Sequence, residues 1–297
     1  MPINLSIRIC IYNAEVNKVM KHENFKKCCN EIKSQGYTII RNFINKDDIE
    51  LLLKETKSFE QTKMRSTTGN EIIDSKLTLT PHKNSINFCN IIFDKTIERF
   101  CKYFLNDIFY RSIPEDLPNY SLNMSIVRSS GKDLLTFHRD DRNPPSNSKE
   151  VSNLQFALAL EKSDESNGCT VCIPGSHLFD YYVRDLEKYN IFNFVLQPGD
   201  LMIYDGRLWH SASPNHSDRS RWKFFFGYCR WHIKQTYDYT KNIDTNILKN
   251  LTLNQKLILG FHCITKVSDD GVDGAGQRGD LDYAEKKYQH ELSSRQI

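Results

Sequence analysis

Three side chains of the kinds that bind transition metals occur in an order along the sequence that is typical of a metal site. His138, Arg139 and Asp140 form an H-x-D at the end of a β-like run, and His210 lies far downstream at the start of another. Because strand side chains alternate between faces, His138 and Asp140 are expected on one face and Arg139 on the other. Two imidazoles and one carboxylate leave the opposite face of a metal open, which suits non-haem Fe(II). Zinc enzymes also use such sites, so the triad alone does not fix the metal.

An arginine follows the second histidine. Arg221 comes after His210 across a turn rich in Pro, Asn and Asp, and it begins the next long predicted strand. A hairpin would place Arg221 beside His210, and a planar guanidinium is suited to bind a carboxylate through two hydrogen bonds. Arg219 is the nearby alternative, but it falls inside the turn. We therefore expect Arg221 to face the metal site.

The elements that would position these residues are mostly short and β-rich. From residue 119 onward, strands are expected at 120–128, 133–139, 153–161, 169–174, 192–197, 200–205, 208–213 and 221–233. Short strands separated by turn signals, without long helices between them, predict an antiparallel sandwich or barrel. The fold class expected is therefore mainly β.

Helices flank this predicted β-core. They are expected at 19–35, 46–59, 86–106 and 245–261, with a short strand at 37–43. The polar segment 60–84 is a candidate flap. We divide the chain into an N-terminal helical and β region packed on the core (1–118), the β-core (119–235), and a C-terminal helical cap with a polar tail (236–297), which together form a single catalytic domain.

Composition and charge favour a globular protein. The 297 residues include 40 Lys and Arg against 37 Asp and Glu, a formal net charge of +3. This balance argues against a nucleic-acid binder. No apolar run reaches the roughly 18–20 residues of a membrane span. The first residues lack the pattern of a secretory signal. We expect a cytoplasmic monomer or weak homo-oligomer that binds neither nucleic acid nor membrane.

Cysteines indicate no other chemistry. There are nine, scattered along the chain, which does not resemble a disulfide framework. Cys169 and Cys172 form a CxxC, but on a strand these two positions face opposite sides, and there is no second CxxC to complete a zinc site. We interpret them as buried thiols.

Longer motifs resemble one enzyme family. HRD (138–140), NGCTVCIPGSH (167–177) and LQPGDLMIYDGRLWHSASPNHSDRSRW (196–222) resemble, in this order, the phytanoyl-CoA dioxygenase family of Fe(II)/2-oxoglutarate oxygenases. The resemblance implies a double-stranded β-helix (jelly-roll, cupin-like) core with flanking helices. It also implies that His138, Asp140 and His210 bind the iron, and that Arg221 binds the distal carboxylate of 2-oxoglutarate.

The same resemblance implies an activity. Such an enzyme uses Fe(II), 2-oxoglutarate and O2 to oxidise an unactivated C–H bond of a small metabolite, with succinate and CO2 as co-products. Hydroxylation is the expected outcome, with desaturation and oxidative ring closure as further outcomes. Two alternatives stay open: a non-catalytic jelly-roll binding protein, and a zinc-dependent hydrolase that uses the same triad.

The chain departs from the family pattern at several positions. Ser211-Ala212 stands where Gly-Ser is common, Lys223 where a hydroxyl often follows the arginine, and Ala157 where relatives carry a large aromatic residue. Further contacts to 2-oxoglutarate are therefore open, and the candidates are Asn123 and Gln155.

Arginines near the predicted site raise the question of substrate charge. Arg128, Arg139 and Arg142 flank the site, and Arg139 and Arg142 are candidates to bind an anionic substrate, the alternative being ordinary surface arginines. The loop 141–152 begins directly after Asp140. We expect it to close over the substrate, as loops on rigid scaffolds often do.

Overall fold

The fold is taken from a computed structural model of the chain, which describes residues 20–65, 71–106, 118–146 and 148–261 and the short strands at 267–268 and 271–272. Its helices are α1 (His22–Gln35), α2 (Lys46–Ser58), α3 (Ile86–Ile92), α4 (Lys95–Leu105), α5 (Thr245–Asn250) and α6 (Leu253–Leu259). The first two are close to the expected bounds. Gly36 ends α1 with a φ of 92°, a conformation that favours glycine, and the Asn45 side chain caps the start of α2.

Two stretches expected as single helices are each divided into two. The Asp94 side chain accepts hydrogen bonds from the backbone N–H groups of Thr96 and Ile97, and so begins α4 immediately after α3. Thr252 and Gln255 form a capping box that begins α6 after α5. The prediction of continuous helices over 86–106 and 245–261 was wrong because helical spacing of apolar residues continues across these caps.

Two antiparallel sheets form the centre of the molecule. The larger has the order β1-β8-β5-β10-β4-β3-β2 and the smaller the order β7-β6-β9. The strands of the larger sheet are β1 (Tyr37–Ile40), β2 (Thr62–Arg65), β3 (Glu71–Leu79), β4 (Tyr120–Arg128), β5 (Asn153–Ala159), β8 (Leu201–Asp205) and β10 (Lys223–Arg230). Those of the smaller sheet are β6 (Thr170–Cys172), β7 (Phe192–Phe194) and β9 (His210–Ala212). A separate pair, β11 (Val267–Ser268) and β12 (Gly271–Val272), lies outside both sheets.

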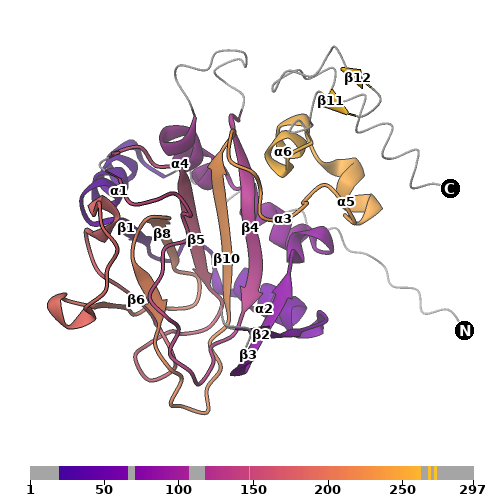
Figure 1. Cartoon of the computed structure of the whole chain (residues 1–297). Coiled ribbons are helices and arrows are strands. Elements are labelled where there is room, and N and C mark those ends of the chain that lie inside the picture. The colour runs from indigo at the N-terminus through magenta and orange to yellow at the C-terminus, as the bar shows by residue number, and fades with distance from the viewer. Residues whose placement is uncertain are drawn as a thin grey trace, which may run out of the picture.

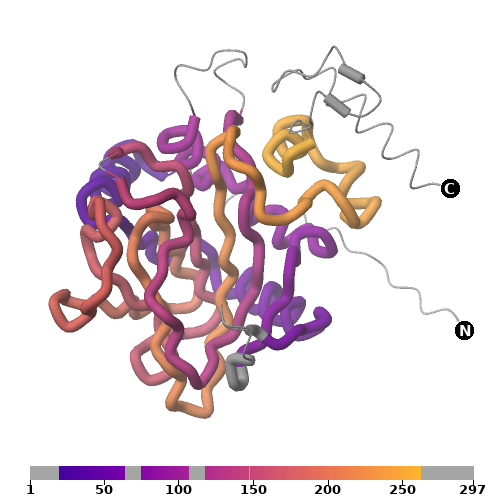
Figure 2. The backbone as a smooth tube through the Cα atoms, in the orientation of Figure 1, coloured from indigo at the N-terminus to yellow at the C-terminus, as the bar shows by residue number. Residues whose placement is uncertain are grey.

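Strands from distant parts of the sequence lie side by side. Figure 1 shows β5, β10 and β4 adjacent in the middle of the molecule, and Figure 2 shows the orange segment of β10 running between magenta segments. The N-terminal region supplies three strands of the larger sheet. The segment 60–84, considered as a flap, instead contributes β2 and β3 at one edge of that sheet.

The strand predicted at 133–139 is not formed. In this stretch His138 alone makes a ladder contact, an isolated antiparallel bridge to His210 at the edge of the smaller sheet. The alternation of polar and apolar residues in DLLTFHR is typical of a strand, but in the structure only His138 pairs with a neighbouring strand. This bridge nevertheless joins two of the three predicted metal ligands.

Apolar side chains pack in two layers. Phe224 and Phe226 of β10 belong to a large core between the larger sheet and the helices, whereas Phe225 belongs to a smaller core between the two sheets. This alternation follows from the two-residue period of a strand. The two facing antiparallel sheets confirm the predicted mainly β, jelly-roll fold with flanking helices.

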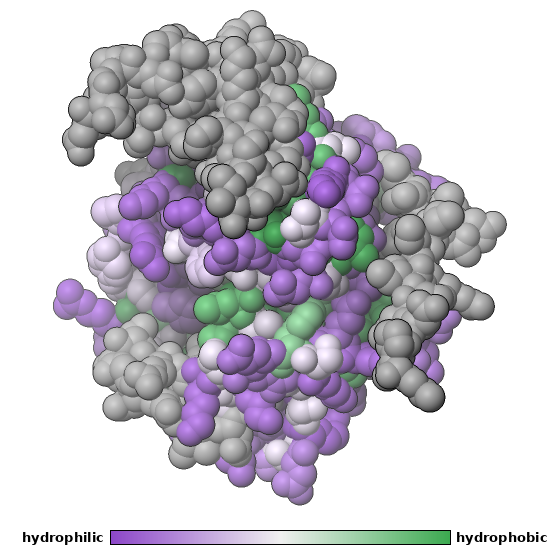
Figure 3. All heavy atoms as spheres, turned by 90° about the vertical axis from the view of Figure 1, so that its right-hand side faces the viewer, coloured by the Kyte–Doolittle hydropathy of each residue, from purple (hydrophilic) through white to green (hydrophobic). Residues whose placement is uncertain are grey.

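The surface and the cysteines agree with a globular protein. The face seen in Figure 3 is predominantly hydrophilic, with apolar side chains in small patches. None of the helices in the described part of the chain is long and apolar enough to cross a membrane. Cys169 and Cys172 are both buried and free, as interpreted from the sequence.

Candidate active site

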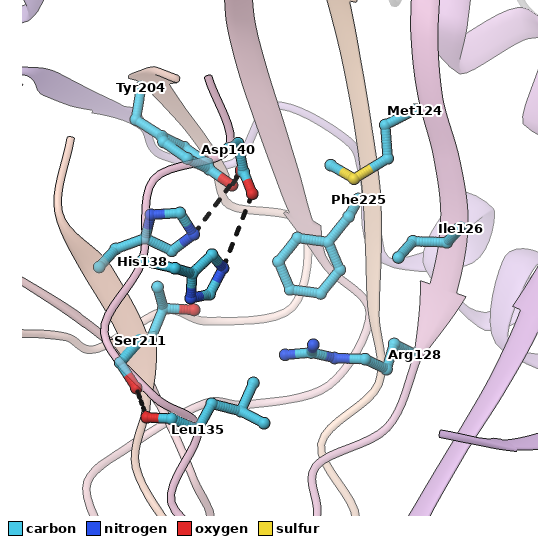
Figure 4. A pocket seen from close by; sticks show the side chains of 11 residues that line it. Met124, Ile126, Arg128, Leu135, His138, Asp140, Tyr204, Ser211 and Phe225 are labelled. Carbon is cyan, nitrogen blue, oxygen red and sulfur yellow. Dashed lines mark hydrogen bonds and ion pairs between the residues drawn. The ribbon is translucent and has the colours of Figure 1, made fainter. Parts of the chain in front are cut away.

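The predicted metal ligands meet at one point. Within the described residues, His138, Asp140 and His210 form a group whose potential ligand atoms all lie within 4.8 Å of one another. His138 Nε2 is 3.7 Å from Asp140 Oδ1, and His210 Nε2 is 3.6 Å from Asp140 Oδ2. Figure 4 shows both contacts. Backbone hydrogen bonds between His138 and His210, 2.9 and 3.0 Å long, fix the two histidines opposite each other.

Backbone carbonyl groups orient both imidazoles. His138 Nδ1 lies 2.8 Å from the carbonyl oxygen of Thr136, and His210 Nδ1 lies 2.9 Å from that of Leu208. Each Nδ1 therefore carries the proton and donates it, which leaves the Nε2 lone pair directed at Asp140 and available to a metal. Burial lowers the pKa of His210 to about 4, so this imidazole is neutral at physiological pH. The donor set and its orientation fit a divalent transition metal.

A tyrosine that sequence reasoning did not find holds the carboxylate. Tyr204, fully buried on β8, donates a hydrogen bond of 2.8 Å to Asp140 Oδ2. Burial raises the pKa of Tyr204 well above its ordinary value, with a further contribution from Asp140, so the phenol keeps its proton. The available signal was a tyrosine within an otherwise aliphatic strand, DLMIYD. Its partner could be known only once the loop after His138 was placed.

The triad opens onto a small cavity of about 60 Å³. His138, Asp140 and His210, together with Tyr204, form one wall. Met124, Ile126, Arg128 and Phe225, from β4 and β10, form the opposite wall (Figure 4). The guanidinium of Arg128 points from the end of β4 into this space (Figure 4). The cavity thus combines the candidate metal ligands, an apolar wall and a cation.

Arg221 lies behind this cavity. Its side chain is 1% exposed, and its Nε and Nη1 have no hydrogen-bond partner in the described part of the chain. It lines a smaller adjoining cavity, and Arg128 and Leu135 line both. Burial, and then the nearby charge of Arg128, lower the pKa of Arg221 to about 9. A buried guanidinium with unsatisfied donors is a site prepared for an anion.

The alternative arginine is engaged elsewhere. Arg219 is exposed, and its Nη2 lies 3.1 Å from Asp164 Oδ2. Of the two arginines considered from the sequence, Arg221 is therefore the one placed beside the metal cavity.

A large part of the sequence matches one known family. The family model for phytanoyl-CoA dioxygenase (PhyH) matches residues 32–222, more than half of the chain. The chain belongs to the phytanoyl-CoA dioxygenase family. This confirms the resemblance stated above and the expectation of a dioxygenase that depends on iron and 2-oxoglutarate.

Individual relatives are distant. Dioxygenase aneA of Aspergillus aculeatus is 24% identical over 261 residues, which is 82% of this chain and 85% of that protein. The uncharacterized protein YJR154W of Saccharomyces cerevisiae is 23% identical over 258 residues, 80% of this chain and 74% of that protein.

Solved structures share the fold. HygX from Streptomyces hygroscopicus, with nickel and 2-oxoglutarate bound, has a TM-score of 0.58 at 11% identity and covers 71% of this chain and 89% of its own. The epimerase SnoN, in complex with Fe3+, alpha ketoglutarate and nogalamycin RO, has a TM-score of 0.57 at 17% identity and covers 71% and 85%.

Against this family background, the two further candidates for 2-oxoglutarate contacts lie away from the cavity. Asn123 Oδ1 accepts a hydrogen bond of 3.0 Å from the backbone N–H of Thr236. Gln155 donates to Asn153 Oδ1 over 2.7 Å, and its amide packs where a side chain at Gly227 would stand. Neither Asn123 nor Gln155 lines the cavity. The structure gives both residues positions that tie neighbouring segments to the sheet.

The candidate substrate arginines are also placed outside the cavity lining. Arg139 donates to the backbone carbonyl oxygen atoms of Asn143 and Asp141, and Arg142 is exposed. The loop that follows is held at its base, where Asp141 accepts hydrogen bonds from Ser152 Oγ and the backbone N–H of Asn143. Arg139 thus organises the loop rather than the pocket.

Proposed function

We propose that this family member is an Fe(II)- and 2-oxoglutarate-dependent dioxygenase that oxidises a C–H bond of a small metabolite, most simply by hydroxylation. The observation that carries the proposal is the placement of His138, Asp140 and His210 at the edge of a cavity that leads to the buried guanidinium of Arg221. A metal site open on one side and an anion site behind it are what joint binding of iron and a dicarboxylate requires.

Each group in the cavity has a distinct task in this proposal. His138, Asp140 and His210 would hold the iron, which when bound supplies the activation of O2 that is coupled to decarboxylation of 2-oxoglutarate. Tyr204 keeps the Asp140 carboxylate in a fixed orientation. Arg221 holds the distal carboxylate of the co-substrate. This leaves the wall formed by β4 and β10 to position the substrate and exclude water.

The substrate class follows from that wall. Met124, Ile126 and Phe225 offer apolar contact to the part of the substrate that carries the reacting C–H bond. An anionic group elsewhere on the substrate would be held by Arg142, with Arg139 as its neighbour at the base of the loop. The hygromycin B bound to HygX and the nogalamycin RO bound to SnoN support a small-molecule substrate. A cytoplasmic monomer or weak homo-oligomer remains our proposal for the state of the protein.

A metabolite screen tests this function. The protein with Fe(II), 2-oxoglutarate and O2 is incubated with fractions of small metabolites, and both succinate and oxidised products are measured. We expect one fraction to raise succinate formation together with a product that carries one additional oxygen atom. Asp140→Ala should abolish both signals, whereas Arg219→Ala, a change in the exposed turn, should retain them.

The same screen separates the alternatives. A zinc hydrolase would cleave its substrate with zinc bound and without consuming 2-oxoglutarate. A binding protein would retain a metabolite without forming succinate. Either result would contradict the proposed oxidation.

A further inference from the structure

A lysine is buried next to the candidate co-substrate site. Lys223 is 0% exposed and lies on β10, two residues from Phe225, so the two side chains share the face of the strand that is directed between the sheets. Its Nζ donates a hydrogen bond of 3.0 Å to Thr170 Oγ1. Phe225 and Thr170 both line the metal cavity, so the amino group of Lys223 stands one hydrogen bond behind the cavity wall.

The surroundings of this amino group are cationic. The groups that act on it electrostatically are Arg221, Arg128 and the thiol of Cys169. In the neighbouring strands, Arg128 of β4 and Ala159 of β5 stand opposite Lys223. No carboxylate is among these groups; within the described residues, Asp140 acts electrostatically on Arg128, and Asp133 lines the smaller cavity beside Arg221 and Arg128. Lys223 and Arg221 are almost fully buried, and the half-buried Arg128 brings a second guanidinium to the same site.

Of these three groups, the lysine is the one that can give up its charge. Even with its pKa lowered to about 9, Arg221 keeps its proton near neutral pH, whereas a lysine amine loses its proton readily when it is buried. Burial, and then the charge of Arg221, lower the pKa of Lys223 well below its ordinary value. The hydrogen bond that Nζ donates to Thr170 Oγ1 can be made by a neutral amine as well as by a charged one.

Binding of a dicarboxylate would favour the protonated form of Lys223. The Nε and Nη1 of Arg221 have no partner in the described part of the chain, and a carboxylate bound to them would bring a negative charge beside Lys223. Resting on the proposed function, we propose that Lys223 is a proton-coupled positioning residue for 2-oxoglutarate. Its amine is neutral while the site is empty and takes up one proton from solvent when the distal carboxylate binds.

This assignment makes co-substrate affinity depend on pH. In the complex, Lys223 is in the ammonium form. Between the pKa of Lys223 in the free protein and its higher pKa in the complex, each unit rise in pH therefore weakens 2-oxoglutarate binding roughly tenfold. The family pattern, with a hydroxyl at this position, offers no such titrating group. Lys223 would therefore make this chain differ from relatives that carry the hydroxyl.

Calorimetry of co-substrate binding tests the proposal. Anaerobic Fe(II)-loaded protein is titrated with 2-oxoglutarate at about pH 8 in buffers of different ionisation enthalpy, which gives the number of protons taken up on binding. Pyruvate, which retains the metal-chelating end but lacks the distal carboxylate, is the matched ligand. We expect uptake of about one proton with 2-oxoglutarate and nearly none with pyruvate.

Variants assign the proton to the residue. Lys223→Met and Lys223→Ser should bind 2-oxoglutarate without proton uptake and with a Kd that does not change with pH, and Lys188→Met, at an exposed position, should behave as the unmodified protein. Equal uptake with both ligands, or uptake retained in a folded Lys223 variant, overturns the proposal while the proposed function stands. Absence of 2-oxoglutarate binding to the Fe(II)-loaded protein overturns both. The ligand comparison needs no variant, so it decides the matter even where both substitutions prevent folding.

Discussion

Removal of one hydroxyl group should loosen the metal site without altering its shape. Tyr204→Phe keeps the aromatic ring, whose centre lies 5.1 Å from that of His210, and deletes the hydrogen bond to Asp140 Oδ2. That oxygen is also the one 3.6 Å from His210 Nε2. The carboxylate of the variant would be free to turn away from the metal.

The expected loss can be worked from this geometry. Groups that orient metal ligands typically contribute 10- to 100-fold in affinity, or about 1.4–2.8 kcal/mol. The Asp140 side chain is 20% exposed, so water can replace part of the lost hydrogen bond. We therefore expect the lower half of this range, about 10- to 30-fold weaker Fe(II) binding.

Anaerobic competition against a chromogenic chelator measures that affinity. Tyr228→Phe is the matched control, because Tyr228 is equally buried and its hydroxyl donates to the carbonyl of Ile92 in the core on the other side of β10. It should lower the free energy of unfolding by about 1 kcal/mol and leave Fe(II) affinity unchanged. Equal Fe(II) affinity in Tyr204→Phe and the unmodified protein would refute the account of how Asp140 is held.

Further expectations concern the cations around the cavity. Arg221→Ala should weaken 2-oxoglutarate binding by about 2–5 kcal/mol, and Arg219→Ala should have little effect; the reverse result in a binding titration would mean that the strand register is misplaced. Lys223 is protonated in the unfolded chain and neutral in the folded chain. The free energy of unfolding of the protein, relative to that of Lys223→Met, should therefore increase by about 1.4 kcal/mol for each unit rise in pH, up to the ordinary lysine pKa near 10.4. Urea unfolding at several pH values checks this slope, and a flat difference contradicts a neutral Lys223. Arg142→Ala should raise the KM of an anionic substrate without changing uncoupled 2-oxoglutarate turnover, and an unchanged KM would remove the anionic-substrate hypothesis. The loop 141–152 should gain hydrogen-exchange protection when substrate binds, and equal protection would remove the lid.

The metal site could be predicted because both the types of its residues and their order along the sequence are characteristic. H-x-D and the later histidine already indicated the donor set, and the family motifs supplied their order. The fold class followed from short strands with frequent turns. The spacing of apolar residues did not reveal that a single bridge at His138 replaces the expected strand.

Residues that act through a partner were hidden from the sequence. Tyr204 is seen to be important only when Asp140 is placed opposite it. Lys223 was noted as a departure from the family pattern, but its burial between Arg221 and Thr170 comes from the register of β10 against the strands around it. Asn123 and Gln155 share the expected sheet, yet their side chains have local partners that periodicity does not reveal.

Joint binding of Fe(II) and 2-oxoglutarate at one site is the central claim. Anaerobic optical titration tests it most directly, because chelation of Fe(II) by a 2-oxo acid produces a visible absorption band. We expect the band to appear when 2-oxoglutarate is added to the Fe(II)-loaded protein and to be lost in His210→Ala. Tightly bound zinc, with no band and no change on addition of 2-oxoglutarate, would contradict the assignment of His138, Asp140 and His210 to iron.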